Sequence, residues 1–300
     1  MTDQIKQIED MSLNAWPSHK MELYDGWIIR FSYFYTHRTN SVEQFGTSHL
    51  TWREKIPHCE ALYERLGSPV IFKISPLVSP DFDYMLENRG YSIEHSTDVM
   101  TLSLADIVPE NDNYEAPPAG SLSDENMRAV SLSNQTVPAG SLSAQAMSES
   151  RRSSYSIEYS DSISPEWIEA LFTLKGTTNA VHRAVVPSMY RAIMKETVSA
   201  CIRVDGKIAA TGLGILDRDY IGIYAIHVRE DMRRKGIARM ICCGLLSEGK
   251  RRGAANAYLQ VVSDNEPARR LYGSLGFKKL YSYWFRVKRS PDHHSQRTEI

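Results

Sequence analysis

The sequence predicts an α+β protein in which one βαβ crossover lies within a mainly antiparallel sheet. Three consecutive strand-like runs with short turns, over residues 198–228, predict an antiparallel meander. A segment of helical period at 236–249 and a further apolar run at 257–262 predict a crossover to a parallel strand. The first hundred residues also mix helical and strand patterns, so two units of this class are expected.

Composition agrees with a globular chain that is long enough for two domains. The 300 residues are 42% hydrophobic and 24% charged, with a formal net charge of -1, so the overall charge gives no sign of nucleic-acid binding. No apolar run approaches the roughly 18 residues that span a bilayer, and no apolar stretch typical of a signal peptide follows the N-terminus. The four cysteines lack a C-x-x-C spacing, which favours reduced thiols in a cytoplasmic protein.

The chain changes composition near its middle. Residues 111–156 are rich in Ser, Asn, Ala and Pro, and Pro-Ala-Gly-Ser-Leu-Ser occurs there twice, at 118–123 and 138–143. This composition is typical of a linker. The predicted division is an N-terminal domain at 1–110, a linker at 111–156, a second domain at 157–288 and a polar tail at 289–300.

Local signals bound the elements before the linker. Trp16-Pro17 should end the first helix, while Gly67 and Gly90 should close two later ones. The expected helices cover 5–14, 52–66 and 81–89, and the expected strands cover 26–33, 70–74 and 99–104.

Similar signals follow the linker. Ser164 can cap a helix, and Pro165 suits its first turn. Pro187 is read in the same way, and Asp205-Gly206 predicts a tight turn. One expected helix begins at 164, and three others cover 187–196, 236–249 and 267–275. The expected strands cover 198–204, 208–216, 220–228, 257–262 and 281–287.

A basic loop between a strand and a helix is the most informative segment. The strand ends at Val228 and the helix begins at Gly236, where unpaired backbone amides would suit a diphosphate. Residues 229–252 hold eight cationic and three acidic side chains, which indicates a polyanionic ligand. The alternative is the solvated rim of a surface helix.

A second motif lies further along the chain. Asn265 or Asp264 can cap a helix that begins near Pro267. Asn265 and Tyr272 are seven residues apart, so both can face one groove. Taken alone, Tyr272 could be an ordinary tyrosine at the rim of an amphipathic helix.

Together these residues resemble the GNAT superfamily of acetyl-CoA-dependent N-acetyltransferases. Its loop signature, [Arg/Gln]-x-x-Gly-x-[Gly/Ala], is matched by Arg-Arg-Lys-Gly-Ile-Ala at 233–238. Its second signature is matched by Asn265, Tyr272 and Leu-Gly-Phe at 275–277. The resemblance is clear over residues 198–288.

The first half resembles bacterial tandem-GNAT proteins, among them an actinobacterial type of N-acetylglutamate synthase. The resemblance is carried by the segments at 13–17, 25–27 and 38–42, in which Thr39 replaces a usual alanine. It implies two GNAT-like domains, each with a mixed, mostly antiparallel sheet flanked by helices. Because residues 1–110 lack the Arg-x-x-Gly-x-Ala loop, the first domain is expected to be a degenerate repeat without cofactor binding.

The resemblance implies acetyl-CoA as co-substrate and a role for each matched residue. Tyr272 would be the general acid that protonates the departing thiolate, and Asn265 would hydrogen-bond to CoA. The pantetheine arm would pair with the backbone at Ile226 and Val228. The pyrophosphate would be held by the loop, at Arg233, Arg234, Lys235, Gly236, Ile237 and Ala238. No metal is expected.

The acceptor is expected to be the primary amine of a small molecule, such as an amino acid, which attacks directly in a ternary complex. Arg38, Asn40 and Ser41 could shape its pocket or could simply form a polar turn. No nucleic-acid or membrane partner is expected, and the chain could form a homodimer.

The general base is missing from its usual place. Many family members carry a carboxylate on the fourth strand, where this chain has Gly222 between Tyr220 and Tyr224. Regular alternation turns His227 away from Ile226 and Val228, which favours a packed histidine. Water or a residue of the first half could take the proton instead.

Two other classes of function were weighed. A GNAT-like module could sense acyl-CoA without turnover, since a fold alone does not grant activity. Nucleic-acid binding through residues 229–252 would call for aromatic side chains among the cations, and the segment has none. No Walker-type phosphate loop occurs.

Overall fold

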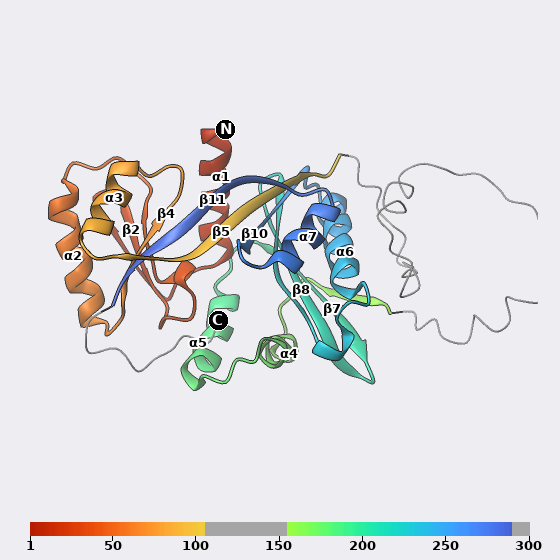
Figure 1. The fold of residues 1–300 in the computed structure, drawn as a ribbon. Coiled ribbons are helices and arrows are strands. Elements are labelled where there is room, and N and C mark those ends of the chain that lie inside the picture. The colour runs from red at the N-terminus through yellow and green to blue at the C-terminus, as the bar shows by residue number, and fades with distance from the viewer. Residues whose placement is uncertain (106–154, 290–300) are drawn as a thin grey trace, which may run out of the picture.

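The computed structural model describes residues 1–105 and 155–289, which form one continuous mixed sheet with helices on both faces (Figure 1). Its eleven strands lie in the order β1-β2-β3-β4-β11-β5-β10-β9-β8-β7-β6. The predicted linker, its repeated hexapeptide and the polar tail fall almost wholly outside the described residues. No described helix is both long enough and apolar enough to cross a membrane.

The two halves share an order of elements, to which the second half adds a first strand and one more helix before its meander. The first half contains α1 (Thr2–Ala15), β1 (Lys20–Tyr24), β2 (Trp27–Phe31), the 3-10 turn η1 (His37–Thr39), β3 (Val42–Gln44), α2 (Trp52–Arg65), β4 (Val70–Ile74), α3 (Pro80–Asn88) and β5 (Ser92–Ser103). The second half contains β6 (Ile157–Ser160), α4 (Pro165–Lys175), α5 (Ala180–Arg191), β7 (Glu196–Val204), β8 (Lys207–Asp217), β9 (Tyr220–Val228), η4 (Glu230–Met232), α6 (Ile237–Arg251), β10 (Asn256–Val262), α7 (Glu266–Ser274) and β11 (Lys278–Lys288).

Each half has an antiparallel meander followed by a parallel crossover. In the second half β7, β8 and β9 are antiparallel, and α6 connects β9 to the parallel strand β10. In the first half β1, β2 and β3 are antiparallel, and α2 connects β3 to the parallel strand β4. The predicted α+β class and the predicted crossover are therefore confirmed.

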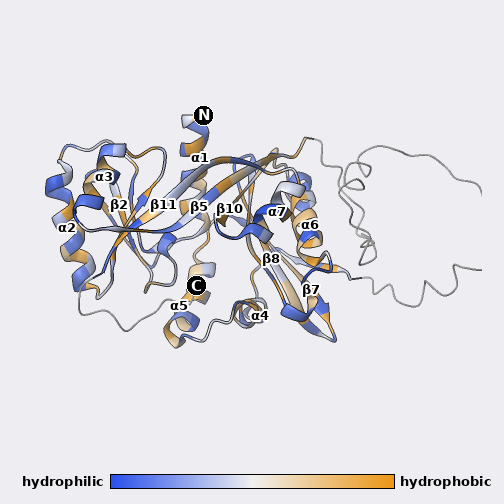
Figure 2. Ribbon diagram, in the orientation of Figure 1, coloured by the Kyte–Doolittle hydropathy of each residue, from blue (hydrophilic) through white to orange (hydrophobic). Residues whose placement is uncertain are grey.

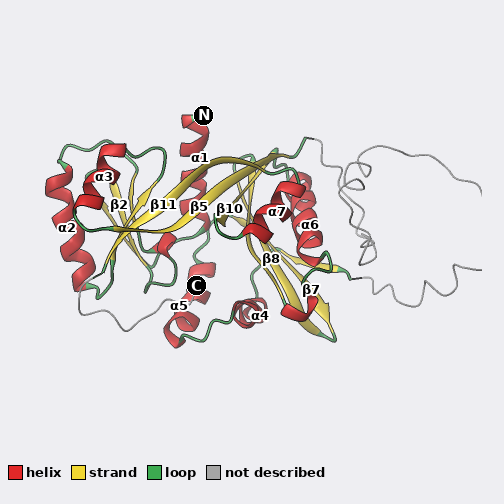
Figure 3. Ribbon diagram, viewed as in Figure 1, coloured by secondary structure: helices red, strands yellow, loops and turns green. Residues whose placement is uncertain are grey.

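The last strand of each half is inserted into the sheet of the other half. Strand β11 pairs with β4 on one side and with β5 on the other, and β5 also pairs with β10. Figure 3 shows β5 and β11 as two long strands that run side by side between the halves. The predicted ranges 1–110 and 157–288 thus name two sequence repeats that share their central strands.

The helices of the second half cover opposite faces of its sheet. Helix α6 buries Ile237, Ile241 and Leu245 against one face. Helices α4 and α5 pack on the other face, where the sheet contributes Leu213 and Ile215. Figure 2 shows mixed hydropathy on the helices, as expected for elements with one buried side, and on the long strands β5 and β11.

Some element boundaries differ from the predicted ones. The helix expected at 187–196 is α5, which begins after Asn179, because the Asn179 side chain accepts hydrogen bonds from Val181 N and His182 N. Pro187 lies inside it rather than at its start. Strand β5 begins at Ser92, seven residues before the expected start at 99. Its polar first part is a strand because β11 pairs with it.

A buried ionic network joins α1 to the first half of the sheet. Lys73 on β4 pairs with Glu9 on α1 and, at 3.5 Å, with Glu43 on β3. Arg30 on β2 lies 3.5 Å from Glu43. The two cations and two carboxylates balance in charge, which offsets the cost of burying each of them. The carboxylates outweigh the desolvation of Lys73 and raise its pKa.

Candidate active site

The basic loop between β9 and α6 is exposed and has its amides free at the start of the helix. Gly236 is the N-cap with φ +79°, and no side chain caps it. Arg234 is also left-handed, with φ +61°. The first backbone hydrogen bond of the helix turn runs from Met240 N to Gly236 O, so the amides of residues 237–239 precede it. A Cβ at Gly236 would meet nothing within 4 Å, so the space before these amides is open.

Strand β9 has a free edge next to this loop. It pairs with β10 only from Tyr220 to Ile223, although both strands continue beyond that point. On its other side β9 stays paired with β8 as far as Val228. The two parallel strands therefore diverge, and the β10 side of β9 from Tyr224 to Val228 is open to an extended ligand. Ile226 and Val228, the predicted pantetheine contacts, lie on this segment.

A β-bulge in β9 changes which side chains share a face. Leu213 of β8 pairs with Tyr224, and Thr211 pairs with His227, so the single residue Gly212 lies opposite two residues of β9. One of these two, Ala225, has a positive φ of +51°. A bulge reverses the alternation beyond it. Regular alternation would place His227 opposite Tyr224, whereas the structure puts both on the face covered by α4. Ile226 packs on the α6 side.

Tyr272 and Asn265 lie on α7, which packs on the α6 side of the sheet. Tyr272 packs against the same large apolar cluster as Ile226 and Val228. Burial raises the pKa of Tyr272, so its phenol carries a proton at neutral pH. Asn265, rather than Asp264, is the N-cap, and its oxygen accepts a hydrogen bond from Ala268 N at 3.2 Å. Its amide nitrogen can still donate to a ligand.

Tyrosines dominate the face of β9 opposite α6. Tyr224 and Tyr220 both pack against Tyr258 of β10, and the Tyr224 and Tyr258 hydroxyls are 2.6 Å apart. Gly222 makes this possible, because a Cβ there would lie 2.6 Å from the Tyr224 ring. Burial, with the charges of Lys175 and Arg233, lowers the pKa of His227 to about 4. His227 is therefore neutral at pH 7 and able to accept a proton.

The three residues considered for an acceptor pocket differ in their contacts. Asn40 is fully buried, and its oxygen accepts from Ser32 N and Phe34 N, so it holds a turn together. Ser41 is also buried. Arg38 is half-buried, and its Nε donates to the Tyr283 hydroxyl at 3.0 Å, within the sheet that joins the halves.

In the first half, the segment that corresponds to the predicted phosphate loop has its backbone amides bound by side chains of the protein. The segment between β3 and α2 corresponds to the loop before α6, but the carboxylate of Asp25 accepts there from His49 N and Leu50 N. Thr51 and Glu54 form a capping box on the first turn of α2. An internal carboxylate and a capped helix thus take the amides that would face a phosphate. This agrees with the prediction of a degenerate repeat.

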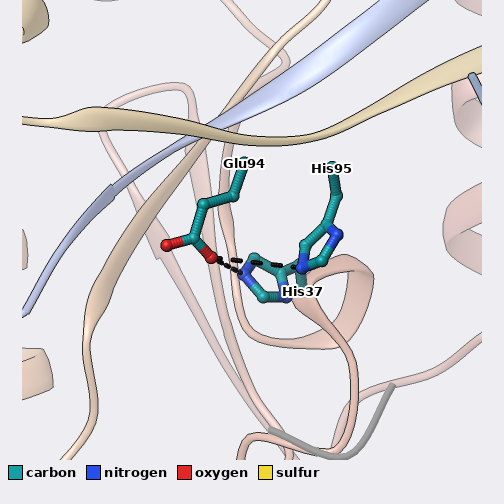
Figure 4. A group of neighbouring side chains, drawn as sticks. All are labelled: His37, Glu94 and His95. Atoms are coloured by element: carbon teal, nitrogen blue, oxygen red, sulfur yellow. Dashed lines mark hydrogen bonds and ion pairs between the residues drawn. The ribbon is translucent and has the colours of Figure 1, made fainter. Parts of the chain in front are cut away.

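His37, Glu94 and His95 form a cluster whose possible ligand atoms lie within 4.8 Å of one another (Figure 4). His37 Nε2 is 3.1 Å from Glu94 Oε2. Imidazoles and a carboxylate are typical zinc ligands, but the guanidinium of Arg289 donates to both Glu94 oxygens. The guanidinium neutralises the Glu94 carboxylate, and these interactions join η1, β5 and the residue that follows β11.

Sequence reasoning missed Lys175, which ends α4, and the tyrosines of β10 and β11. A lysine before Gly176 reads as an ordinary C-terminal helix residue, so no signal marked it. A tyrosine within an apolar strand reads as core.

Comparison with known proteins gives matches over both halves. Residues 147–277 match the acetyltransferase (GNAT) family, and residues 2–113 match the "Probable histone acetyltransferase Rv0428c C-terminal" family. The chain is 24% identical over 293 residues to the uncharacterized N-acetyltransferase YobR of Bacillus subtilis, covering 96% of this chain and all of YobR.

Two further matches are more limited. The [ribosomal protein bS18]-alanine N-acetyltransferase of Escherichia coli is 35% identical over 75 residues, which are 25% of this chain and 51% of that enzyme. A tandem GNAT protein from the clavulanic acid biosynthesis pathway has a similar fold, with a TM-score of 0.59 and 12% identity over 95% of this chain and 89% of that one.

The meander, the diverging strands and the open helix start, together with these matches, define an acetyltransferase. More particularly, residues 147–277 match the GNAT acetyltransferase family, and the fold of the chain resembles that of a tandem GNAT protein. GNAT acetyltransferases use acetyl-CoA as their acetyl donor.

Proposed function

We propose that this chain transfers the acetyl group of acetyl-CoA to a primary amine of a small molecule, by direct attack in a ternary complex. The observation that carries this is the open amide cradle before α6 beside the free edge of β9. The amides at Gly236 to Ala238, with the cations Arg233, Arg234 and Lys235, would hold the pyrophosphate. The β9 edge at Ile226 and Val228 would pair with the pantetheine arm.

The reaction needs few residues once both substrates are held. The neutral amine nitrogen attacks the thioester carbonyl carbon, the C–S bond breaks, and the thiolate leaves. Tyr272 is protonated and would donate its proton to that sulfur. A strand amide near Val228 would stabilise charge on the carbonyl oxygen. His227, neutral and on the face of Tyr224, would take the proton of the amine directly or through water.

The test is thiol release from acetyl-CoA with a panel of amines, combined with calorimetric titration of acetyl-CoA. We expect binding and amine-dependent release. Tyr272→Phe should lower kcat by about 10²–10⁴-fold, as expected when a general acid is lost. Tyr84→Phe, on the exposed side of α3, is the matched control.

Three results would count against parts of the proposal. An unchanged rate and pH profile in Tyr272→Phe would refute the assignment of the acid. Acetyl-CoA binding without release for any amine would favour a non-catalytic sensor. Absence of acetyl-CoA binding would overturn the cradle itself.

A further inference from the structure

Two cations on the acceptor face, Lys175 and Arg38, have no carboxylate partner in the part of the chain that the structure describes. Lys175, at the end of α4, is half-buried, and its Nζ lies 3.4 Å from the Tyr35 hydroxyl and 4.6 Å from the centre of that ring. Arg38, in η1, is half-buried and bonds to the neutral hydroxyl of Tyr283. Within 1–105 and 155–289, neither has an acidic group at ion-pair distance.

The two charges act on each other. Burial and the charge of Arg38 lower the pKa of Lys175, and no carboxylate opposes this shift. Several other half-buried cations among the described residues are paired with a carboxylate, as Lys195 is with Asp217 at 2.9 Å. Half-burying two like charges side by side is costly unless an anion compensates them, so the arrangement is typical of a site for an anionic ligand.

This pair lies beside the reacting edge of β9. The ring of Tyr35, which Lys175 covers, packs in the same apolar cluster as Tyr224 and Ala225 at the bulge. The ring of Tyr283, to which Arg38 donates, packs in a cluster that also includes Tyr224. Tyr224 and His227 are the side chains that the bulge places on one face. The pair also lies on the side of β9 opposite α6, whose start would hold the coenzyme. A ligand bound here would therefore approach the thioester from the acceptor side.

We propose that the acceptor is an anionic amine, and that Arg38 and Lys175 hold its carboxylate while its amino group faces the β9 bulge. This deepens the function proposed above and rests on it. The fork of the Arg38 guanidinium suits a planar carboxylate, and Lys175 adds a point charge. The bound anion would also offset the positive charge next to His227, which favours transfer of the amine proton to that imidazole.

The experiment compares acceptors that differ only in charge. Each free amino acid is paired with its carboxamide, and aminoalkyl phosphates form a third arm. We expect kcat/KM to be at least tenfold higher for the carboxylate than for the carboxamide. Lys175→Met and Arg38→Gln should each raise KM for the carboxylate at least tenfold and leave kcat within about threefold. The preference for the carboxylate over the carboxamide should fall at least tenfold, and the KM for acetyl-CoA should not change. Lys207→Met, an exposed lysine at the start of β8, is the control.

Each outcome decides the inference. Equal use of carboxylates and carboxamides, or variants that weaken both alike, would overturn it while leaving the acetyltransferase function intact. Preference for phosphates would keep the anion site and correct the anion. Failure to bind acetyl-CoA and to acetylate any amine would overturn the proposed function and this inference together. If a variant unfolds, Lys175→Gln with the same pair of acceptors replaces it.

Discussion

Gly212→Ala tests whether the packing under the bulge positions the coenzyme site. Gly212 of β8 lies opposite the extra residue of β9 and below α6. A Cβ there would be 2.3 Å from Ile241 Cγ2 and 3.0 Å from both Ile226 Cδ1 and Leu245 Cδ1. Carbon atoms in contact are normally about 3.5–4.0 Å apart, so Ile241 must move by more than about 1 Å. Overpacking of this size costs about 1–3 kcal/mol.

The cost should appear in both stability and binding. At about 2–4 °C per kcal/mol, Tm should fall by about 2–12 °C. Because Ile241 is on α6 and Ile226 is on the free edge, the same shift should raise the KM for acetyl-CoA severalfold. Gly273→Ala is the matched control, because no atom lies within 4 Å of its Cβ and alanine favours a helix. Thermal unfolding and initial rates measure both effects. A variant with wild-type Tm and KM would refute the reasoning.

Three further predictions concern the buried charges and the loop. Lys73→Met should lower the free energy of unfolding, measured with urea, by about 3–5 kcal/mol, because it leaves the buried carboxylate of Glu9 without a cation. The exposed Lys6→Met should change it by less than about 0.5 kcal/mol, and equal losses in the two variants would contradict this. Burial disfavours the charged form of Glu94 and so raises its pKa, but hydrogen bonds from His37 and Arg289 outweigh this effect and lower the pKa to about 2. The stability that Glu94 contributes to the folded state, at most about 3 kcal/mol, is present above pH 4.5 and is lost as the pH falls toward 2. In Glu94→Gln the free energy of unfolding should therefore fall less steeply over that pH range. Parallel curves of unfolding free energy against pH for wild type and variant would contradict this. Gly236→Val should weaken acetyl-CoA binding, measured by calorimetry, at least tenfold, because a branched residue is strained at φ +79° and adds bulk at the cradle. Unchanged affinity would mean that the pyrophosphate does not bind at this loop.

The sequence predicted well the features that local signals control. Strands at 70–74 and 220–228 were placed without error, and Ser164 caps α4 as expected, by accepting from Trp167 N. The Asp205-Gly206 turn has two left-handed residues, as a two-residue hairpin requires. In each case a few neighbouring residues determine the backbone.

The features that sequence reasoning missed depend on distant partners. Strand β11 pairs with β4 about two hundred residues away, and nothing in either segment marks that pairing. The bulge places Ala225, not a glycine, at positive φ, so no composition signal reveals it. Consequently the face of His227 and its neighbour Lys175 could not be assigned from alternation alone.

The exchanged strands set an order in which the molecule can be completed. Residues 284–288 fill the gap beside β4, so the first half lacks an inner strand until nearly the end of the described chain has left the ribosome. Until then β4 and β5 each present an unpaired edge, the kind of surface that chaperones protect and that neighbouring chains can capture. If the gene were cut between the repeats, each fragment would lack a strand of its sheet. Folding of either fragment would then depend on association with the other.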